Sequence, residues 1–296
     1  MIPRSNFNRR LEPAAGILHG AGQSPEAFAA YVAAVWPYRP CIYMTYIGMK
    51  ENIPAYFEQL NAQLRPYSSG LIPQIGLGMT TDGKPEEHYE HRVAAGEYDE
   101  QIEQLWQGVR NLNRLAFVRI GYEFSGHWNG YLPESYRQAW QRVVTRQRQM
   151  DVGQIASVWC YAPDSRDKDY MAYYPGDEWV DWWGIDLFSP GHFSAPDTLA
   201  FMSDARAHRF PVMIGESTPR RVGVLDGQAS WEVWFALYFD FIEAQSHLKA
   251  FCYINWDWAG YPQWSDWGDC RLEMNPHVLA SYRRRLSNPL YLHLHE

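Results

Sequence analysis

The chain has 296 residues, 46% of them hydrophobic and 20% charged, so it can bury a large core and is not disordered. Lysine and arginine total 26 against 34 aspartates and glutamates, and the net charge of −8 disfavours a nucleic acid as partner. No apolar run reaches the roughly 18 residues of a membrane span, so no membrane partner is expected.

Short apolar runs rich in β-forming residues alternate along the chain with stretches of helical period. The apolar runs are residues 15–18, 40–46, 71–77, 116–122, 155–161, 182–188, 211–214 and 250–256. The helical stretches are residues 25–36, 54–64, 98–112, 133–150, 195–208, 230–244 and 276–286. The connection 162–181 shows no convincing helix.

Nearly continuous apolar strands that alternate with helices indicate a parallel sheet covered on both faces. Eight such units predict an α/β protein with a single (β/α)8 TIM barrel over residues 1–296 and no separate carbohydrate-binding module. The competing fold is a doubly wound open sheet. It is disfavoured because Gly20-Ala21-Gly22 is not followed by the GxGxxG spacing of a phosphate-binding turn.

Cysteine and histidine spacing gives no sign of a metal centre or cofactor. The four cysteines have no CxxC spacing, and three lie in apolar runs, so buried free thiols are expected. The ten histidines show no HxH or HExxH pattern. Asp164, Asp167 and Asp169 follow the fifth strand but lack the glycine and distal glutamate of a calcium loop, which predicts a solvated turn.

Two glutamates stand where a TIM barrel places its catalytic groups, at the carboxyl ends of strands. Glu123 follows the fourth strand and Glu216 the seventh. Glycosidic cleavage requires two such carboxyl groups. Arg119 lies four residues before Glu123, so strand alternation directs it to the same side, where it can keep a carboxylate ionised. The alternative is that each glutamate caps a helix or pairs with an arginine.

Three motifs, in order, resemble glycoside hydrolase family 26. Residues 119–129, RIGYEFSGHWN, are similar to the family's fourth-strand motif. Residues 174–186 are similar to the segment leading into its sixth strand, and residues 211–216 to its seventh. The resemblance implies a TIM barrel of the large clan of retaining β-glycosidases, with Glu123 as acid/base and Glu216 as nucleophile.

The activity that this resemblance implies is endo-acting hydrolysis of a β-linked oligo- or polysaccharide. β-Mannan is the first expectation, and β-1,3-/1,4-glucan and β-1,3-xylan are alternatives. The chain departs from the family at Tyr122, Ser125 and Phe188, where the family has His, often Asn, and usually Tyr. These positions shape the subsite of the cleaved sugar, so the identity of that sugar stays open.

Two other interpretations remain. One is a retaining glycosidase of another family in the same clan, which would keep the catalytic pair. The other is a non-catalytic carbohydrate-binding barrel. Glu123, Glu216 and Arg119 argue against the second interpretation, because burying three charged side chains is costly and a protein that only binds carbohydrate does not need them.

Aromatic and polar residues near the strand ends are the candidates for binding substrate. Trp256 ends the eighth strand, where the clan commonly places a tryptophan beneath the scissile sugar. The other candidates are His19, Tyr122, His127, Trp128, Asn129, Asp186, Phe188 and Trp258. Structural roles compete for several of them: His19 as a satisfied structural histidine, Trp128 as a loop brace and Trp258 as a core residue. We expect a monomer; the resemblance favours secretion, although this chain begins with no signal peptide.

Overall fold

The structure is a computed structural model that describes residues 4–81, 83–164 and 169–294. Its strands are β1 (Ile17–Gly22), β2 (Ile42–Gly48), β3 (Ile72–Gly78), β4 (Ala116–Ile120), β5 (Ile155–Tyr161), β6 (Trp182–Leu187), β7 (Val212–Ser217), β8 (Leu248–Ile254) and β9 (Tyr291–Leu292). The sheet order is β2-β3-β4-β5-β6-β7-β8-β1-β9, and β1 also pairs with β2. This pairing closes a ring of eight strands, so the predicted (β/α)8 barrel is confirmed.

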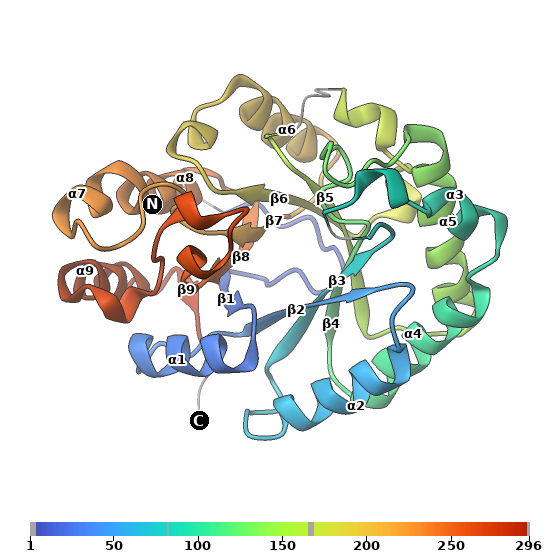
Figure 1. Ribbon diagram of the computed structural model, residues 1–296, viewed down its shortest axis with the longest axis horizontal. Coiled ribbons are helices and arrows are strands. Elements are labelled where there is room, and N and C mark those ends of the chain that lie inside the picture. Colours follow the sequence, from blue (N-terminus) through green and yellow to red (C-terminus); the bar gives the residue numbers. More distant parts are fainter. Residues whose placement is uncertain (1–3, 82, 165–168, 295–296) are drawn as a thin grey trace. The chain divides into compact units, whose positions relative to one another are not determined.

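Helices alternate with these strands (Figure 1). They are α1 (Pro25–Val35), α2 (Ile53–Leu64), α3 (Glu90–Ala95), α4 (Asp99–Leu112), α5 (Pro133–Gln149), α6 (Pro196–Ala207), α7 (Gln228–Ser230), α8 (Ala236–Ala244) and α9 (Pro276–Leu286). Local sequence explains their starts. Ser24 accepts a hydrogen bond from the backbone N–H of Ala27 and is followed by Pro25, and Asn275 caps α9 in the same way.

By its internal contacts the chain divides into two compact units. The first comprises residues 1–8, 12–44 and 186–296, and the second comprises residues 9–11 and 45–185. In the first unit β1 pairs in parallel with β8, with Gly20 opposite Cys252, and β7 pairs in parallel with β8. All four cysteine thiols of the chain are buried, as expected, and they form no disulfide.

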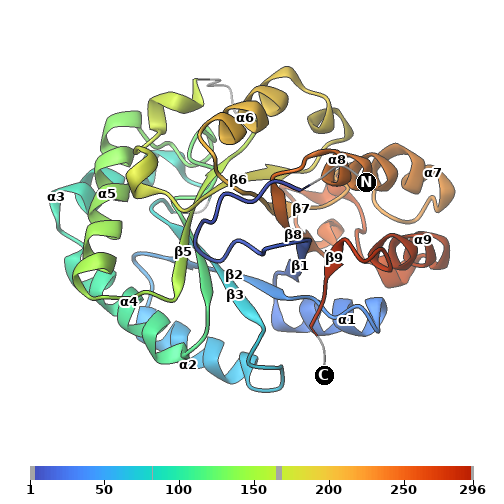
Figure 2. The same ribbon diagram turned by 180° about the vertical axis from the view of Figure 1, so that it is seen from behind.

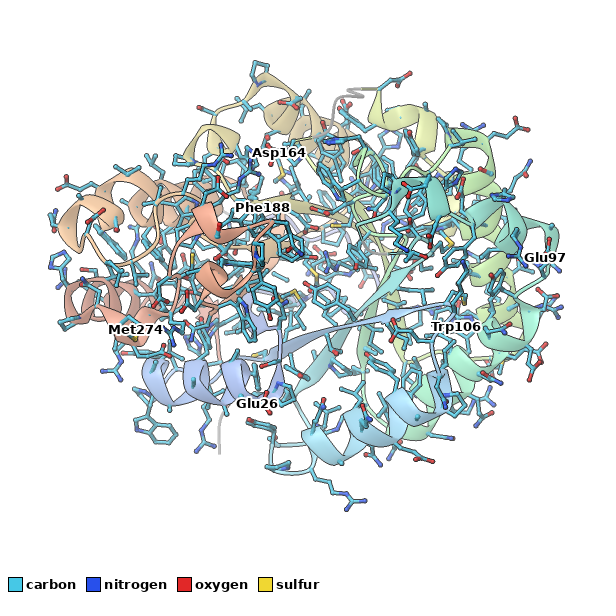
Figure 3. The ribbon with its side chains drawn as sticks, viewed as in Figure 1. Glu26, Glu97, Trp106, Asp164, Phe188 and Met274 are labelled. Atoms are coloured by element: carbon cyan, nitrogen blue, oxygen red, sulfur yellow. The ribbon has the colours of Figure 1, made fainter. Side chains whose placement is uncertain are left out.

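In the second unit β3, β4 and β5 pair in parallel, with Arg119 opposite Gly76 on one side and Val158 on the other. The helices α2, α4 and α5 lie side by side along these strands (Figures 1 and 2). Trp106 of α4 is fully buried, and its indole N–H donates to the carbonyl of Val143 in α5 at 3.0 Å (Figure 3). This bond fixes the two helices against each other.

Most strand boundaries differ from the predictions by one to a few residues, and the shifts at β1, β4 and β8 concern candidate site residues. β8, predicted over 250–256, runs from Leu248 to Ile254, so Trp256 lies beyond the strand that it was expected to end. The first strand, predicted over 15–18, runs from Ile17 to Gly22, so His19 lies inside the strand and not near its end. The reason is that Gly20 and Gly22 continue the strand instead of breaking it. The fourth strand, predicted to residue 122, ends at Ile120 because Gly121 and Glu123 take φ values of +54° and +51°.

The helix predicted over 230–244 is interrupted: a π-helical turn at Trp231–Phe235 separates α7 from α8. The short α3 and β9 were not predicted. The described part of connection 162–181 holds only 3-10 turns, as expected, and Asp167 lies outside the described residues. Among the described residues, no helix has the length and hydrophobicity needed to cross a membrane.

Candidate active site

Glu123 lies in the second unit, three residues after the end of β4, and Glu216 lies in the first unit, on β7. The backbone around Glu123 is tightly held. The side-chain amide of Asn129 donates to the carbonyls of Tyr122 and Glu123 at 3.0 and 3.1 Å, and the N–H of Gly126 donates to the carbonyl of Glu123 at 2.8 Å. These three bonds fix a loop in which Glu123 has a positive φ.

The carboxyl group of Glu123 is half-buried and has a defined partner. The indole N–H of Trp128 donates to Oε2 of Glu123 at 2.6 Å. Trp128 folds over Gly126, where a Cβ would lie 2.4 Å from the indole, so glycine is required for this contact. The arrangement orients one carboxyl oxygen and leaves the group partly accessible, as proton transfer to a substrate requires.

Arg119 is fully buried at the end of β4. Its guanidinium lies over the ring of Tyr122, 4.8 Å from the centroid, and 5.7 Å from that of Tyr46. It also donates to the sulfur of Cys160 at 3.7 Å. Two aromatic faces therefore stabilise a buried cation beside the loop that carries Glu123.

Glu216 is 9% exposed and occupies the penultimate position of β7. The next residues tie this strand end to β8: Ser217 Oγ donates to the carbonyl of Cys252 at 2.7 Å, and Thr218 Oγ1 donates to that of Ile254 at 3.2 Å. Successive side chains of a strand point to opposite faces, so Glu216 projects away from the face of Ser217. The chain directly after Glu216 is thus held against β8.

An aromatic group surrounds the end of β6 and the loop after β8 in the first unit. The ring of Phe188, which follows β6 and is labelled in Figure 3, lies 5.2 Å from that of Trp267. Trp267 in turn lies 4.9 Å from Trp258 and beneath the guanidinium of Arg220, at 5.1 Å. Trp258 is only 6% exposed, so it packs the inside of this loop.

Trp256, the second residue after β8, is partly exposed, and its indole N–H is buried with no hydrogen-bond partner among the described residues. Asp186 is fully buried on β6. His19 is also fully buried: its ring nitrogens lie 2.5 Å from the hydroxyl of Tyr31 and 3.1 Å from Nδ1 of His293. Protein groups therefore occupy both nitrogens of His19, which is the structural role that the sequence left open.

The second unit brings together Arg119, Tyr122, Glu123, Trp128 and Asn129, while His127 stands exposed at the edge of the Trp128 ring, 5.0 Å between centroids. The sequence patterns did not identify Tyr46 or Arg220 as candidate site residues. Tyr46 carried a usable signal, since it ends a predicted strand. Arg220 carried none, because its stacking partner Trp267 is 47 residues away.

A family model described as glycosyl hydrolase family 26 matches residues 81–235, which is half of the chain and includes both glutamates. A β-1,3-xylanase of Alcaligenes sp is 28% identical over 321 residues, covering 96% of this chain and 66% of the relative. A β-1,3-xylanase, TXYA, of Vibrio sp is 27% identical, covering 96% and 67%. The chain therefore spans about two thirds of the length of these relatives.

Two further proteins are more distant. A mannan endo-1,4-β-mannosidase of Bacillus subtilis is 21% identical over 232 residues, covering 67% of this chain and 59% of the relative. The structure of GH26C from Muricauda sp. MAR_2010_75 matches 94% of this chain and 87% of its own, with a TM-score of 0.69 and 16% identity. At that identity the structural match supports the fold alone.

Proposed function

Because the chain belongs to glycosyl hydrolase family 26, we propose that it is a retaining endo-β-glycanase whose first substrate is β-1,3-xylan. The observation that carries the catalytic part is the hydrogen bond from Trp128 to Glu123, which orients a strand-end carboxyl group inside the family-matched segment. The choice of β-1,3-xylan as substrate is supported by two relatives named β-1,3-xylanase, each of which matches 96% of the chain.

Glu123 acts as the acid and then the base. Its carboxyl group protonates the departing glycosidic oxygen, and in the second step it takes a proton from water. Glu216 is the nucleophile that attacks the anomeric carbon and forms the glycosyl-enzyme. Arg119 supports the ionised form of the nucleophile through its positive charge. Retention requires the two carboxyl groups to be about 5–5.5 Å apart, which a crystal structure with bound substrate will measure.

Sugar rings bind to aromatic platforms. Trp256, with its partly exposed ring, is the platform beneath the cleaved sugar. The group formed by Phe188, Trp267 and Arg220 is a second element of substrate recognition. Stacked aromatic faces bind the CH-rich faces of neutral sugars, and this agrees with a β-linked polymer of neutral units.

β-Mannan is the second candidate substrate, because a relative named mannan endo-1,4-β-mannosidase matches 67% of the chain. The test is hydrolysis of β-1,3-xylan, β-mannan, lichenan, laminarin and β-1,4-xylan, with products sized over time. We expect β-1,3-xylan to be cut fastest, with long oligosaccharides appearing first. If only mono- or disaccharides form at the earliest times, the endo assignment is wrong. If every polymer is bound and none is cut, the chain is a carbohydrate-binding barrel.

A further inference from the structure

Three side chains of types that bind metals gather in the second unit, and none of them belongs to the group described around Glu123. His88, Glu90 and His91 each bring one ligand atom to a group in which all these atoms lie within 4.8 Å of one another. Nδ1 of His88 lies 2.7 Å from Oε2 of Glu90, and the two imidazole rings meet edge to face at 5.7 Å. The group stands at the start of α3, which packs against α5 (Figure 1).

The carboxyl group of Glu90 is completely buried, while the His88 side chain is 23% exposed. One carboxyl oxygen, Oε1, accepts hydrogen bonds from the backbone N–H of Leu132 at 3.1 Å and from Ser135 Oγ at 2.7 Å. The other, Oε2, faces His88. A buried carboxylate is stabilised by a compensating cation, and among the described residues it is Oε2, on the side of the histidines, that accepts no backbone or hydroxyl hydrogen bond.

His91 is exposed on the first turn of α3, and its ring makes no hydrogen bond in the part of the chain that the structure describes. Its ring nitrogens are therefore available to a ligand. Because His91 is a surface side chain, a small rotation brings its nitrogen closer to Glu90 without disturbing the core. Glu90, by contrast, is held in place by Leu132 and Ser135.

We propose that His88, Glu90 and His91 form a binding site for one divalent metal ion of the zinc type. Two imidazoles and one carboxylate are ligands that Zn²⁺ favours, at distances of about 2.0–2.2 Å. Mg²⁺ and Ca²⁺ prefer sets made of oxygen alone, so this group discriminates against them. The bonds that Leu132 and Ser135 donate to Oε1 orient the carboxylate for the metal on Oε2. This site departs from the sequence analysis, which found no metal pattern in the spacing of the histidines.

The position of the site gives it a structural role. Leu132, bonded to Glu90, ends the loop that begins after β4 and carries Glu123. The same loop is tied to the residue that follows β3, because the backbone N–H of Met79 donates to the hydroxyl oxygen of Tyr131 at 2.8 Å. A metal ion bound to Glu90 stabilises the loop that carries Glu123 through the bond between Glu90 and Leu132. The ion takes no part in the reaction.

The test is titration of the chelator-treated full chain with zinc chloride alone, by calorimetry and by thermal unfolding. We expect one Zn²⁺ per chain and a rise of a few degrees in the unfolding midpoint at saturating metal. His91→Ala should weaken binding at least tenfold and abolish the rise, because it removes a ligand from the surface without touching the core. His277→Ala is the matched control, since His277 is also exposed and near the start of a helix, and it should bind Zn²⁺ like the parent chain.

Glu90→Gln keeps an oxygen for Leu132 and Ser135 but removes the charge, so it should also bind Zn²⁺ at least tenfold more weakly. If Glu90→Gln fails to fold, the Zn²⁺ affinity of His91→Ala alone tests the proposed site. The proposal is overturned if the parent chain binds no Zn²⁺, if His91→Ala binds it equally well, or if Mg²⁺ or Ca²⁺ binds in preference to Zn²⁺. All these readouts are taken without substrate, so their outcome is independent of the proposed glycanase activity.

Discussion

Glu123 combines a functional group with a strained backbone. A positive φ is uncommon for a residue with a side chain and costs on the order of 1–3 kcal/mol. Here the cost is met by hydrogen bonds from Asn129 and Gly126 to the loop backbone, and the loop in turn positions Trp128 against the carboxyl group. Strain that is held in place by surrounding bonds is typical of residues kept for their chemistry.

The roles proposed for the two glutamates can be separated with an activated aryl β-glycoside. Glu216→Ala should abolish turnover on every substrate, because no glycosyl-enzyme forms without the nucleophile. Glu123→Ala should still allow the first step, since this leaving group needs little protonation, but should slow the second by about 10²–10⁴-fold. Azide needs no base, so it should restore release and give a β-glycosyl azide.

Two outcomes would contradict this assignment. One is a Glu123→Ala variant that matches the parent chain on the aryl glycoside without azide. The other is a rescued product of α configuration from that variant, which would make Glu123 the nucleophile. An α-azide from the Glu216→Ala variant agrees with the assignment.

Trp128 is expected to matter for proton donation. Trp128→Phe keeps the ring over Gly126 but removes the N–H that donates to Glu123, a bond to a charged group worth roughly 1.5–3 kcal/mol. We expect kcat/KM on the polysaccharide to fall about tenfold to a hundredfold, with a much smaller loss on the activated aryl glycoside. Trp36→Phe, at an exposed tryptophan, is the control. Equal losses on both substrates would show that Trp128 does not act through the acid.

At the scale of elements, most of the fold was predictable because its strands are buried apolar runs and its helices are periodic. The shifted boundaries of β1 and β4 both involve glycine. Gly20 and Gly22 lie outside the predicted first strand, yet β1 needs them, since a Cβ on either would lie 2.6 Å from an atom of a neighbouring strand. Whether a glycine ends a strand or allows a neighbouring strand to approach closely depends on tertiary contacts, and the local sequence does not contain this information.

Gly20→Ala tests this close approach. The added Cβ would meet Cys252 Sγ at 2.6 Å, the Cβ of Ile42 at 2.8 Å and the carbonyl oxygen of Phe251 at 2.9 Å. We expect a loss of about 1–3 kcal/mol in the free energy of unfolding, measured by urea denaturation. Gly153→Ala is the control, because its Cβ would meet nothing within 4 Å. A Gly20→Ala variant as stable as this control would mean that β1 can move away from its neighbours.

The candidate site was predictable to the extent that its residues stand at strand ends. Glu123, Glu216 and Arg119 were identified in this way, and the bond between Trp128 and Glu123 joins residues only five apart. The contacts of Phe188 and Arg220 with Trp267 join loops that follow three different strands. Such a group depends on the paths of loops, which strand and helix patterns do not determine.

At the scale of the whole molecule, buried histidines make stability depend on pH. Burial lowers the pKa of His247 to about 4 and that of His19 well below its usual range. His247 is 2% exposed, and its Nε2 lies 2.8 Å from the carbonyl of Met202. Both rings are therefore neutral in the folded chain at a pH where they are protonated in the unfolded chain.

The free energy of unfolding should fall as the pH falls from about 6.5 to about 4, because the unfolded chain binds the protons that the folded chain excludes. For His247 alone the full effect is on the order of 3 kcal/mol. Asp99, whose pKa the guanidinium of Arg142 lowers to about 2, adds its own loss only below about pH 4. Urea denaturation at several pH values will measure the slope. His247→Gln can still donate to Met202 but has no proton to gain, so its slope should be shallower than that of His277→Gln. Equal slopes would mean that the folded chain admits a proton at His247 as readily as the unfolded chain does.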